Sequence, residues 1–386
     1  MVKFKERMMK KTVGVGLIGC GFISTSYLSL APLFKGFTII ACADLNMEAA
    51  KTLASEYQGL EARTVDALLA AGDIDVIINL TIPAAHYSVS MQILNAGKHV
   101  YSEKPFVLSV SEGLQLKALA EKKGLRVGSA PDTFLGGAHQ QARALIDQGK
   151  IGQVISGTCH VMSQGIEHWH PNPDFFFKVG GGPILDIAPY YIANLIQLLG
   201  AVDSVVAKTS IPSQQRKITS QPRDGEMIDV ETPTTIHAIL HFKNGALITL
   251  GASWDVKSHQ HSPMELYGTK GSLYLPDPNF FGGKLVMTEG AYQTRLESWE
   301  HPFSVPNQID GDKALANYRT VGLAEMIMAI EENKDHMCSL DRALHGVEVM
   351  LAILESGETG QTIKMTTECE KPDSLGIDSA RLLLKA

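Results

Sequence analysis

The chain has 386 residues, 45% of them apolar, and a formal net charge of −7 at pH 7. This length exceeds what one hydrophobic core usually supports, so two domains are expected. The acidic balance gives no basis for nucleic-acid or membrane-surface binding, and five dispersed cysteines without a CxxC pair indicate a reducing compartment.

A basic segment at the N-terminus imitates the start of a signal peptide. The segment Leu17-Ile18-Gly19-Cys20 also looks like a lipoprotein cleavage site. However, the apolar run at 13–19 has only seven residues, three of them glycine, which is a poor signal-peptide core. No window is long and apolar enough to span a bilayer, so we expect a cytoplasmic protein and a buried first strand here. The basic residues are Lys3, Lys5, Arg7, Lys10 and Lys11.

Residues 12–130 alternate strand and helix patterns, the signature of a parallel, doubly wound sheet. Asn46 can cap the second helix. Ser109 and Glu112 have capping-box spacing before a helix that ends near Gly124. The predicted strands are 13–18, 37–43, 75–80, 99–102 and 125–129, and the first helix is 22–30.

The pattern changes after residue 132. Helices are predicted at 138–147, 323–332 and 342–355, and the polar stretch 213–231 is expected to be an exposed excursion. The turn Asn244-Gly245 is a strong hairpin signal. Further predicted strands are 154–161, 204–209, 234–242, 247–254, 264–267 and 272–275. We therefore expect a largely antiparallel or mixed sheet covered on one face by helices, and two domains, 1–132 and 133–386.

The first strand leads into Gly19-Cys20-Gly21-Phe22-Ile23-Ser24, a GxGxxG pattern with serine in the third glycine position. The first two glycines permit a tight turn and close approach of a dinucleotide pyrophosphate to a helix N-terminus. Alone, the motif could equally be an ordinary glycine-rich turn. The preceding strand, the following helix and an acidic residue after the second strand favour a dinucleotide site.

That acidic residue is Asp44. A carboxylate there can accept hydrogen bonds from the adenosine ribose hydroxyls and would repel a 2′-phosphate, which favours NAD over NADP. No arginine follows immediately, since the next residues are Leu45 and Asn46. The alternative is that Asp44 is only a helix N-cap.

Two further segments carry candidate chemistry. Glu103-Lys104-Pro105 follows the predicted strand at 99–102, and ligands of open α/β sheets bind at the carboxyl ends of strands. A glycine-rich segment at 180–183 precedes Asp186 and Tyr190, whose i,i+4 spacing would place a carboxylate and a phenol on one helix face. The alternative is an ordinary amphipathic helix with Tyr190 in the core.

The histidine clusters do not have zinc-ligand spacing, so we expect no metal. His237 and His241 would face the same side of a strand. The segment His168-Trp169-His170 is interpreted as a loop near a carbohydrate, because an indole face beside polar donors suits a sugar. A buried tryptophan that anchors a long loop is an equally good interpretation.

In order and spacing, these segments resemble the Gfo/Idh/MocA family, which includes glucose–fructose oxidoreductase and inositol dehydrogenase. The matching segments are 15–21, 75–83 with His86, 96–105 and the glycine-led segment that ends at Asp186.

The resemblance implies an α/β fold with an N-terminal Rossmann domain and a C-terminal α/β domain with a large, mostly antiparallel sheet. That sheet usually carries the oligomer contact and one wall of the substrate pocket. Lys104 corresponds to the catalytic lysine, and Asp186 matches the signature aspartate. Tyr190 stands where many members have a catalytic histidine, which argues against the inositol substrates of those members. The implied cofactor contacts are Gly19, Gly21, Phe22, Ile23, Asp44, Thr81, Pro83, His86, Glu103, Lys104 and Pro105.

The sequence thus predicts an NAD-dependent oxidoreductase that acts on a CH–OH group of a sugar, sugar derivative or polyol, as a homodimer or homotetramer. Lys104 would hydrogen-bond the reacting oxygen, Tyr190 would exchange the proton, and Asp186 would hold the hydroxyl or the lysine. The predicted substrate contacts are Lys104, His168, Trp169, Asp186 and Tyr190.

Two alternatives remain. An NAD-retaining glycoside-processing enzyme would oxidise its substrate only transiently and release no net NADH. A dinucleotide-sensing regulator on the same fold would have no need of the Lys104 and Asp186 pair.

Overall fold

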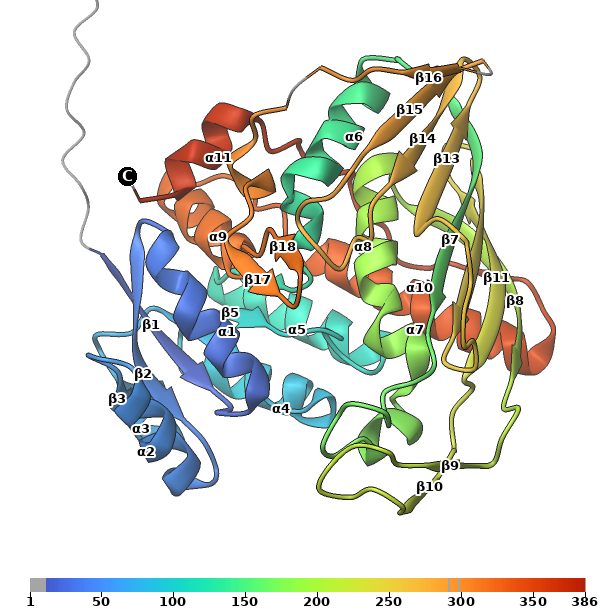
Figure 1. The fold of residues 1–386 in the computed structure, drawn as a ribbon. Helices are drawn as coiled ribbons and strands as arrows, with labels where there is room; N and C mark the ends of the chain where they lie inside the picture. Colours follow the sequence, from blue (N-terminus) through green and yellow to red (C-terminus); the bar gives the residue numbers. More distant parts are fainter. Residues whose placement is uncertain (1–11, 291, 298, 386) are drawn as a thin grey trace, which may run out of the picture.

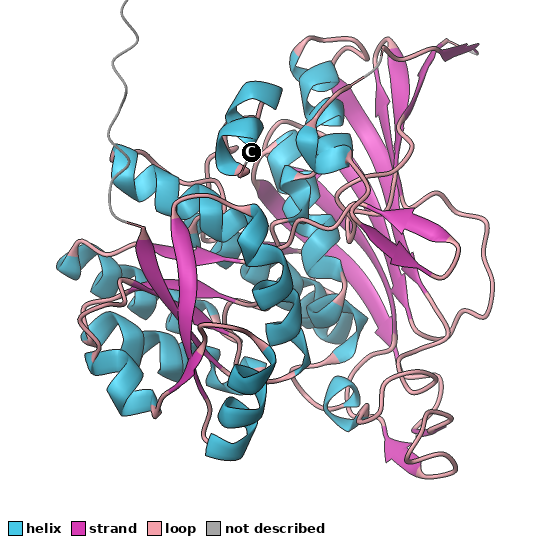
Figure 2. Cartoon of the chain, turned by 60° about the vertical axis from the view of Figure 1, so that its left-hand side comes forward, coloured by secondary structure: helices cyan, strands magenta, loops and turns pink. Residues whose placement is uncertain are grey.

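Two β-sheets, each with its own helices, lie side by side in the computed structural model, which describes residues 12–290, 292–297 and 299–385 (Figures 1 and 2). The basic residues that precede the first strand lie outside these ranges. None of the helices in the described chain has the length and apolar character that a membrane span requires.

The first sheet has six parallel strands in the order β3-β2-β1-β4-β5-β6. Helices connect successive strands, as a parallel sheet requires. The strands are β1 (Val13–Ile18), β2 (Phe37–Ala43), β3 (Glu61–Ala62), β4 (Val76–Asn79), β5 (His99–Ser102) and β6 (Val127–Ser129). The helices are α1 (Phe22–Leu30), α2 (Met47–Glu56), α3 (Val65–Ala70), α4 (Pro83–Asn95) and α5 (Val110–Lys123).

The helix caps predicted from the sequence are present in α2 and α5. The Asn46 side chain accepts from Glu48 N–H at the start of α2. The Ser109 side chain accepts from Glu112 N–H at the start of α5, and Gly124 ends that helix in the left-handed conformation. The two helix starts and this helix end are therefore fixed by residues adjacent in sequence.

The second sheet has nine strands in the order β16-β15-β14-β13-β7-β12-β11-β8-β19. All neighbours are antiparallel except β7 and β12, so the predicted mixed, mostly antiparallel sheet is confirmed. The strands are β7 (Val154–Met162), β8 (Val202–Ser210), β11 (Thr235–Phe242), β12 (Leu247–Ser253), β13 (Met264–Gly268), β14 (Gly271–Leu275), β15 (Val286–Glu289), β16 (Tyr292–Thr294) and β19 (Ile363–Lys364). Asn244 and Gly245 lie in the turn between β11 and β12, as predicted.

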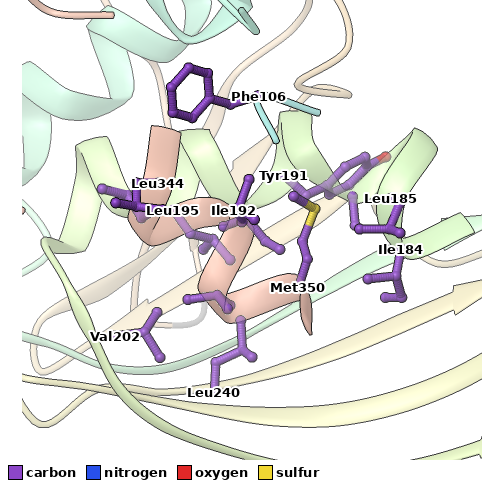
Figure 3. Packing of buried hydrophobic residues seen from close by; sticks show 14 of the residues in the cluster. Phe106, Ile184, Leu185, Tyr191, Ile192, Leu195, Val202, Leu240, Leu344 and Met350 are labelled. Carbon is purple, nitrogen blue, oxygen red and sulfur yellow. The ribbon is translucent and has the colours of Figure 1, made fainter. Parts of the chain in front are cut away.

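One face of this sheet is covered by α6 (Gly137–Asp147), α8 (Ala188–Leu199) and α10 (Leu340–Thr359) (Figure 1). Figure 3 shows Ile192 and Leu195 of α8 between Leu240 of the sheet and Met350 of α10. These side chains are almost fully buried, and each such burial contributes about 1.5–3 kcal/mol. This layer holds α8, and therefore Tyr190, rigidly over the sheet.

The end of the chain returns to the first sheet. Helices α9 (Val321–Glu332) and α11 (Ile377–Leu383) contribute buried residues to the same core as Val15 and Phe34. Phe34 also forms a β-bridge with Leu384. The division at residue 132 stays a prediction, and the last part of the chain packs on both sides of it.

One local prediction is incomplete and another is wrong. Most of the stretch 213–231 is exposed, as predicted, but it also forms the hairpin of β9 (Gln215–Lys217) and β10 (Met227–Asp229). This hairpin buries Ile218, Ile228 and Val230 in one cluster with Trp254. Asp186 and Tyr190 also do not share one helix, because α7 (Gly182–Asp186) ends before Ile187 and α8 begins after it. Pro189 lies in the first turn of α8, where its missing N–H is tolerated.

A second small sheet lies elsewhere on the chain, formed by β17 (Gln308–Asp310) and β18 (Lys313–Leu315).

Candidate active site

The glycine-rich turn lies between β1 and α1. Gly19 has φ 103°, and a Cβ on it would lie 2.6 Å from the backbone of Leu80, so only glycine fits. A Cβ on Gly21 would meet nothing within 4 Å, and no side chain caps α1, which begins with Phe22 and Ile23. The N-terminus of α1 therefore opens onto free space, as an anion site requires.

Asp44 follows β2 directly and is hydrogen-bonded to the glycine-rich turn. One carboxylate oxygen accepts from Cys20 N–H and the other from Asn46 N–H, both at 2.8 Å. The side chain that caps α2 belongs to Asn46, so Asp44 is not the cap of that helix. Each carboxylate oxygen keeps a further lone pair for a ligand hydroxyl.

Two fully or largely exposed apolar side chains lie in the loops after β2 and β4, and both were missed from the sequence. Leu45 is 100% exposed and Ile82 is 67% exposed. Both follow strands of the parallel sheet at its carboxyl edge, where ligands of such sheets bind. The Leu45 and Ile82 side chains can therefore pack against a flat apolar ring of a bound ligand.

The loop after β4 is tied to the loop after β5. His86 of α4 is buried, and its ring nitrogens lie 2.7 Å from the Pro105 carbonyl oxygen and 2.9 Å from the Thr81 carbonyl oxygen. Burial lowers the pKa of His86 and outweighs its bonds to these carbonyls. Pro83 is the first residue of α4. His86 thus braces the loops that carry Thr81 and Pro105, and its direct contact with a cofactor stays a prediction.

Glu103 connects the loop after β5 to α1. Its carboxylate accepts from the Tyr27 hydroxyl at 2.9 Å and from Lys104 N–H at 2.8 Å. Burial and the Glu103 charge raise the pKa of Tyr27, so its hydroxyl stays protonated and donates this bond. The bond places the Lys104 backbone beside the helix that follows the glycine turn.

Lys104, Asp186 and Tyr190 meet although they come from distant segments. The Lys104 Nζ donates to the Asp186 carboxylate at 2.8 Å and to its backbone carbonyl at 2.6 Å. It also lies 5.3 Å from the centroid of the Tyr190 ring. Burial lowers the pKa of Lys104, but the Asp186 and Tyr190 charges raise it by more, so the ammonium stays protonated across the neutral range. The break at Ile187 does not separate the two side chains, because α7 and α8 adjoin.

A cavity of about 640 Å³ lies beside Asp186. Its lining includes His168, Trp169 and Asn279. Trp169 is 65% exposed, so it does not serve as the buried anchor of its loop. His168 is held by the Thr219 hydroxyl at 2.8 Å. Among the described residues, no lysine or arginine lines this cavity.

A partly buried arginine fixes the loop that carries His168 and Trp169. Arg216 of β9 bonds Glu167 at 2.6 Å and Asp255 at 2.5 Å. Glu167 is almost fully buried. The hairpin that looked like an exposed excursion therefore anchors one wall of the cavity.

The histidines do not assemble into a metal centre within the described chain, where no group of three or more His, Cys, Asp or Glu side chains could hold an ion. His237 and His241 lie on the exposed face of β11, as their spacing predicted. His160 and His261 stack with ring centroids 3.9 Å apart.

Comparison with known proteins gives matches to two family models and to many sequences and structures. A model described as "Oxidoreductase family, NAD-binding Rossmann fold" matches residues 13–130. One described as "GFO/IDH/MocA C-terminal domain" matches residues 139–274.

Several relatives match over nearly their full length. An uncharacterised oxidoreductase of Schizosaccharomyces pombe is 26% identical over 87% of this chain and 94% of its own length. The 1,5-anhydro-D-fructose reductase of Ensifer adhaerens is 24% identical over 91% of this chain and 98% of its own length. A structure of levoglucosan dehydrogenase in complex with NADH and L-sorbose superimposes with a TM-score of 0.77 at 20% identity, covering 92% of this chain and 99% of that one. At this identity the structural likeness speaks for the fold alone.

Proposed function

The chain belongs to the Gfo/Idh/MocA family of oxidoreductases, and from that membership we propose that it is an NAD-dependent dehydrogenase or reductase of a neutral sugar or polyol. The observation that carries the proposal is the ion pair of Lys104 with Asp186, 2.8 Å long, beside a cavity that Asp186 lines. The pair lies at the carboxyl end of β5, in the same sheet as the glycine turn.

The residues around the glycine turn fit a dinucleotide. Gly19 and Gly21 leave room for a pyrophosphate at the start of α1, and Leu45 and Ile82 offer apolar contacts to an adenine ring. Asp44 would bond the ribose hydroxyls and repel a 2′-phosphate, so NAD is preferred to NADP. When bound, the nicotinamide supplies or accepts the hydride.

Lys104 would act as a hydrogen-bond donor to the reacting oxygen and not as a base. Its ammonium has three N–H bonds, of which two are directed to Asp186, so one remains for the substrate. Its raised pKa keeps it charged near neutral pH, where it stabilises negative charge that develops on the substrate oxygen.

Tyr190 would carry the proton at its Oη. Its ring lies beside the Lys104 ammonium, so the phenol and the ammonium can both reach one oxygen of the substrate. Asp186 would hold Lys104 in place by accepting two of its N–H bonds.

The cavity favours an uncharged substrate. Its lining includes the carboxylates Asp186 and Asp277 and, within the described residues, no lysine or arginine. A phosphorylated or nucleotide-linked sugar would bring negative charge to these carboxylates, and the nearby Lys104 ammonium is already paired with Asp186. A neutral sugar could instead stack on Trp169 and bond His168 with its hydroxyls.

The open face of the large sheet would carry the contact between copies of the chain. Three large apolar side chains on neighbouring strands are between 38% and 49% exposed there: Val206, Ile239 and Leu247. Exposed apolar side chains grouped on one face are typical of a protein–protein contact. A homodimer or homotetramer through this face is therefore part of the proposal.

A substrate panel tests the proposed function. Purified protein with NAD is offered monosaccharides, anhydrosugars, glycosides, polyols and sugar phosphates, and NADH formation is followed by absorbance. We expect net NADH from at least one neutral compound, little from the phosphates, and a rate lower by on the order of 10²–10³ with the Lys104→Met variant. NAD binding without net NADH from any compound would contradict the proposal and favour transient oxidation or a sensor.

A further inference from the structure

A second cation approaches Tyr190 from a part of the chain that carries no recognisable motif. The Arg319 Cζ lies 5.9 Å from the centroid of the Tyr190 ring, compared with 5.3 Å for the Lys104 Nζ. We propose that Arg319 is a positioning residue of the active site, which orients the Tyr190 phenol and stabilises the charge left on its Oη when the proton moves. This inference rests on the proposed function, because it concerns the proton transfer assigned there to Tyr190.

The guanidinium is held in a fixed orientation. Its Nη2 donates to the Asn279 carbonyl at 3.1 Å and to the Asn279 side chain at 2.9 Å, and its Nη1 donates to Asn317 at 3.2 Å. Asn279 itself lines the cavity beside Asp186. Arg319 therefore joins Tyr190 to a second wall of the same cavity.

The backbone beside Arg319 has a strained conformation at Thr320. Thr320 has φ 92° and is fully buried, and a β-branched residue in this region is a genuine outlier. Such strain persists only where surrounding contacts impose it, and it is concentrated at functional sites. Because Thr320 directly follows Arg319, its backbone conformation helps to fix the position of Arg319 in the turn.

The contacts that impose this conformation come from a segment that is distant in the sequence. The Asp132 Oδ2, just after β6, accepts from Thr320 N–H and from Gly322 N–H, both at 3.0 Å. A Cβ on Gly322 would lie 2.3 Å from the Tyr101 hydroxyl and 2.7 Å from the Cys338 sulfur, so only glycine fits. The turn is thus fastened to β5 and to the segment that follows β6, and it holds Arg319 beside the Tyr190 ring.

The electrostatics agree with this arrangement. Burial lowers the pKa of Arg319, but nearby acidic groups, including Asp132, raise it by more, so the guanidinium remains charged beside the phenol. Arginine also keeps its charge at any physiological pH and presents its donors in a rigid fork. A lysine could supply the charge but not the planar fork of donors that reaches Asn279 and Asn317 together.

A kinetic double-mutant cycle tests the proposal on the substrate found in the panel. Arg319→Met is expected to lower kcat on the order of 10- to 100-fold with little change in KM or in NADH affinity, because the cation acts on the proton-transfer step. Arg319→Lys should recover part of this loss. In the Tyr190→Phe background, Arg319→Met should have almost no further effect, since the oxygen through which it acts is gone. Arg381→Met, at an exposed arginine of α11, is the control for loss of a surface cation.

Two kinetic results would overturn the proposal. An equal loss of kcat in the Tyr190→Phe background would mean that Arg319 acts independently of the phenol. A rise in KM with unchanged kcat would mean that Arg319 binds substrate and does not position Tyr190.

The same four proteins of the cycle are also compared by thermal unfolding, which needs no turnover. A non-additive change in Tm supports contact between the guanidinium and the phenol oxygen, and strict additivity contradicts it. If the wild-type protein oxidises nothing in the panel, the proposed function fails, and the unfolding cycle still decides whether Arg319 acts on Tyr190.

Discussion

Replacing Glu325 with glutamine is expected to stabilise the protein at pH 8 and to leave its stability unchanged near pH 4. Glu325 lies on α9 and is 5% exposed, and its Oε2 accepts from Met337 N–H at 2.9 Å. Burial raises the pKa of its carboxyl from 4.5 to about 7, and the opposing effects of the Met337 N–H and the Arg342 charge are smaller.

The magnitude follows from this pKa difference. Between 4.5 and about 7, at about 1.36 kcal/mol for each pKa unit, ionised Glu325 destabilises the folded state by about 3 kcal/mol. Because the folded state binds the proton more tightly, this destabilisation is absent below pH 4.5, grows as the pH rises toward 7, and is complete above 7. Glutamine keeps an oxygen that can accept from Met337 and carries no charge.

Thermal unfolding of wild type and Glu325→Gln between pH 4 and pH 8 measures the effect. At pH 8 the variant should melt roughly 5 °C higher, and the difference should close toward pH 4. Glu358→Gln, at an exposed glutamate on α10, controls for the change in net charge and should follow the wild type throughout. A variant that is less stable than wild type at pH 8 would refute the reasoning, since Arg342 and Met337 would then stabilise the carboxylate by more than burial destabilises it.

Four further substitutions test the proposed site and its assembly. Lys104→Met should lower kcat by on the order of 10²–10³ with NADH affinity nearly unchanged, and near-native turnover would exclude it as the oxyanion stabiliser. Tyr190→Phe should lower kcat by about 10² or more, and a silent substitution would leave the proton transfer to another group. Asp44→Ser should narrow the preference for NAD over NADP in a titration of both nucleotides; equal affinities in the wild type would already contradict the role of Asp44. Ile239→Lys on the open sheet face should lower the mass measured by light scattering, and an unchanged mass would place the contact elsewhere.

Features governed by neighbouring residues could be predicted from the sequence. The turn at Gly19 needs a positive φ, which glycine adopts without strain, and the GxGxxG pattern that signals this turn spans only six residues. The caps at Asn46 and Ser109 likewise act within three residues. The alternation along β11 also predicted correctly that His237 and His241 share one face of the strand, which the structure shows to be the exposed face.

The sequence was misleading where a mostly polar segment also contains residues that pack in a buried cluster. The stretch 213–231 is polar overall, yet Ile218, Ile228 and Val230 are spaced so that the hairpin buries all three against Trp254. The break between α7 and α8 did have a local signal, because Pro189 inside one continuous helix would have removed a hydrogen bond to the fourth preceding carbonyl. The i,i+4 spacing of Asp186 and Tyr190 nevertheless favoured the prediction of one continuous helix.

Arg319 could not have been found from the sequence at all. Its neighbours along the chain form no motif, and its position depends on hydrogen bonds that backbone N–H groups donate to Asp132, which lies 188 residues away from Thr320. The change of sequence pattern after residue 132 predicts a boundary between two domains, and at such a boundary a flexible linker is the usual expectation. Asp132 is instead 3% exposed and fastens the turn that precedes α9 to the end of the first sheet. The residue at which the sequence pattern changes is therefore part of a buried contact between two distant segments of the chain. Because the turn that it holds also carries Arg319, which lies beside the Tyr190 ring, the geometry of the proton-transfer site depends in part on this carboxylate.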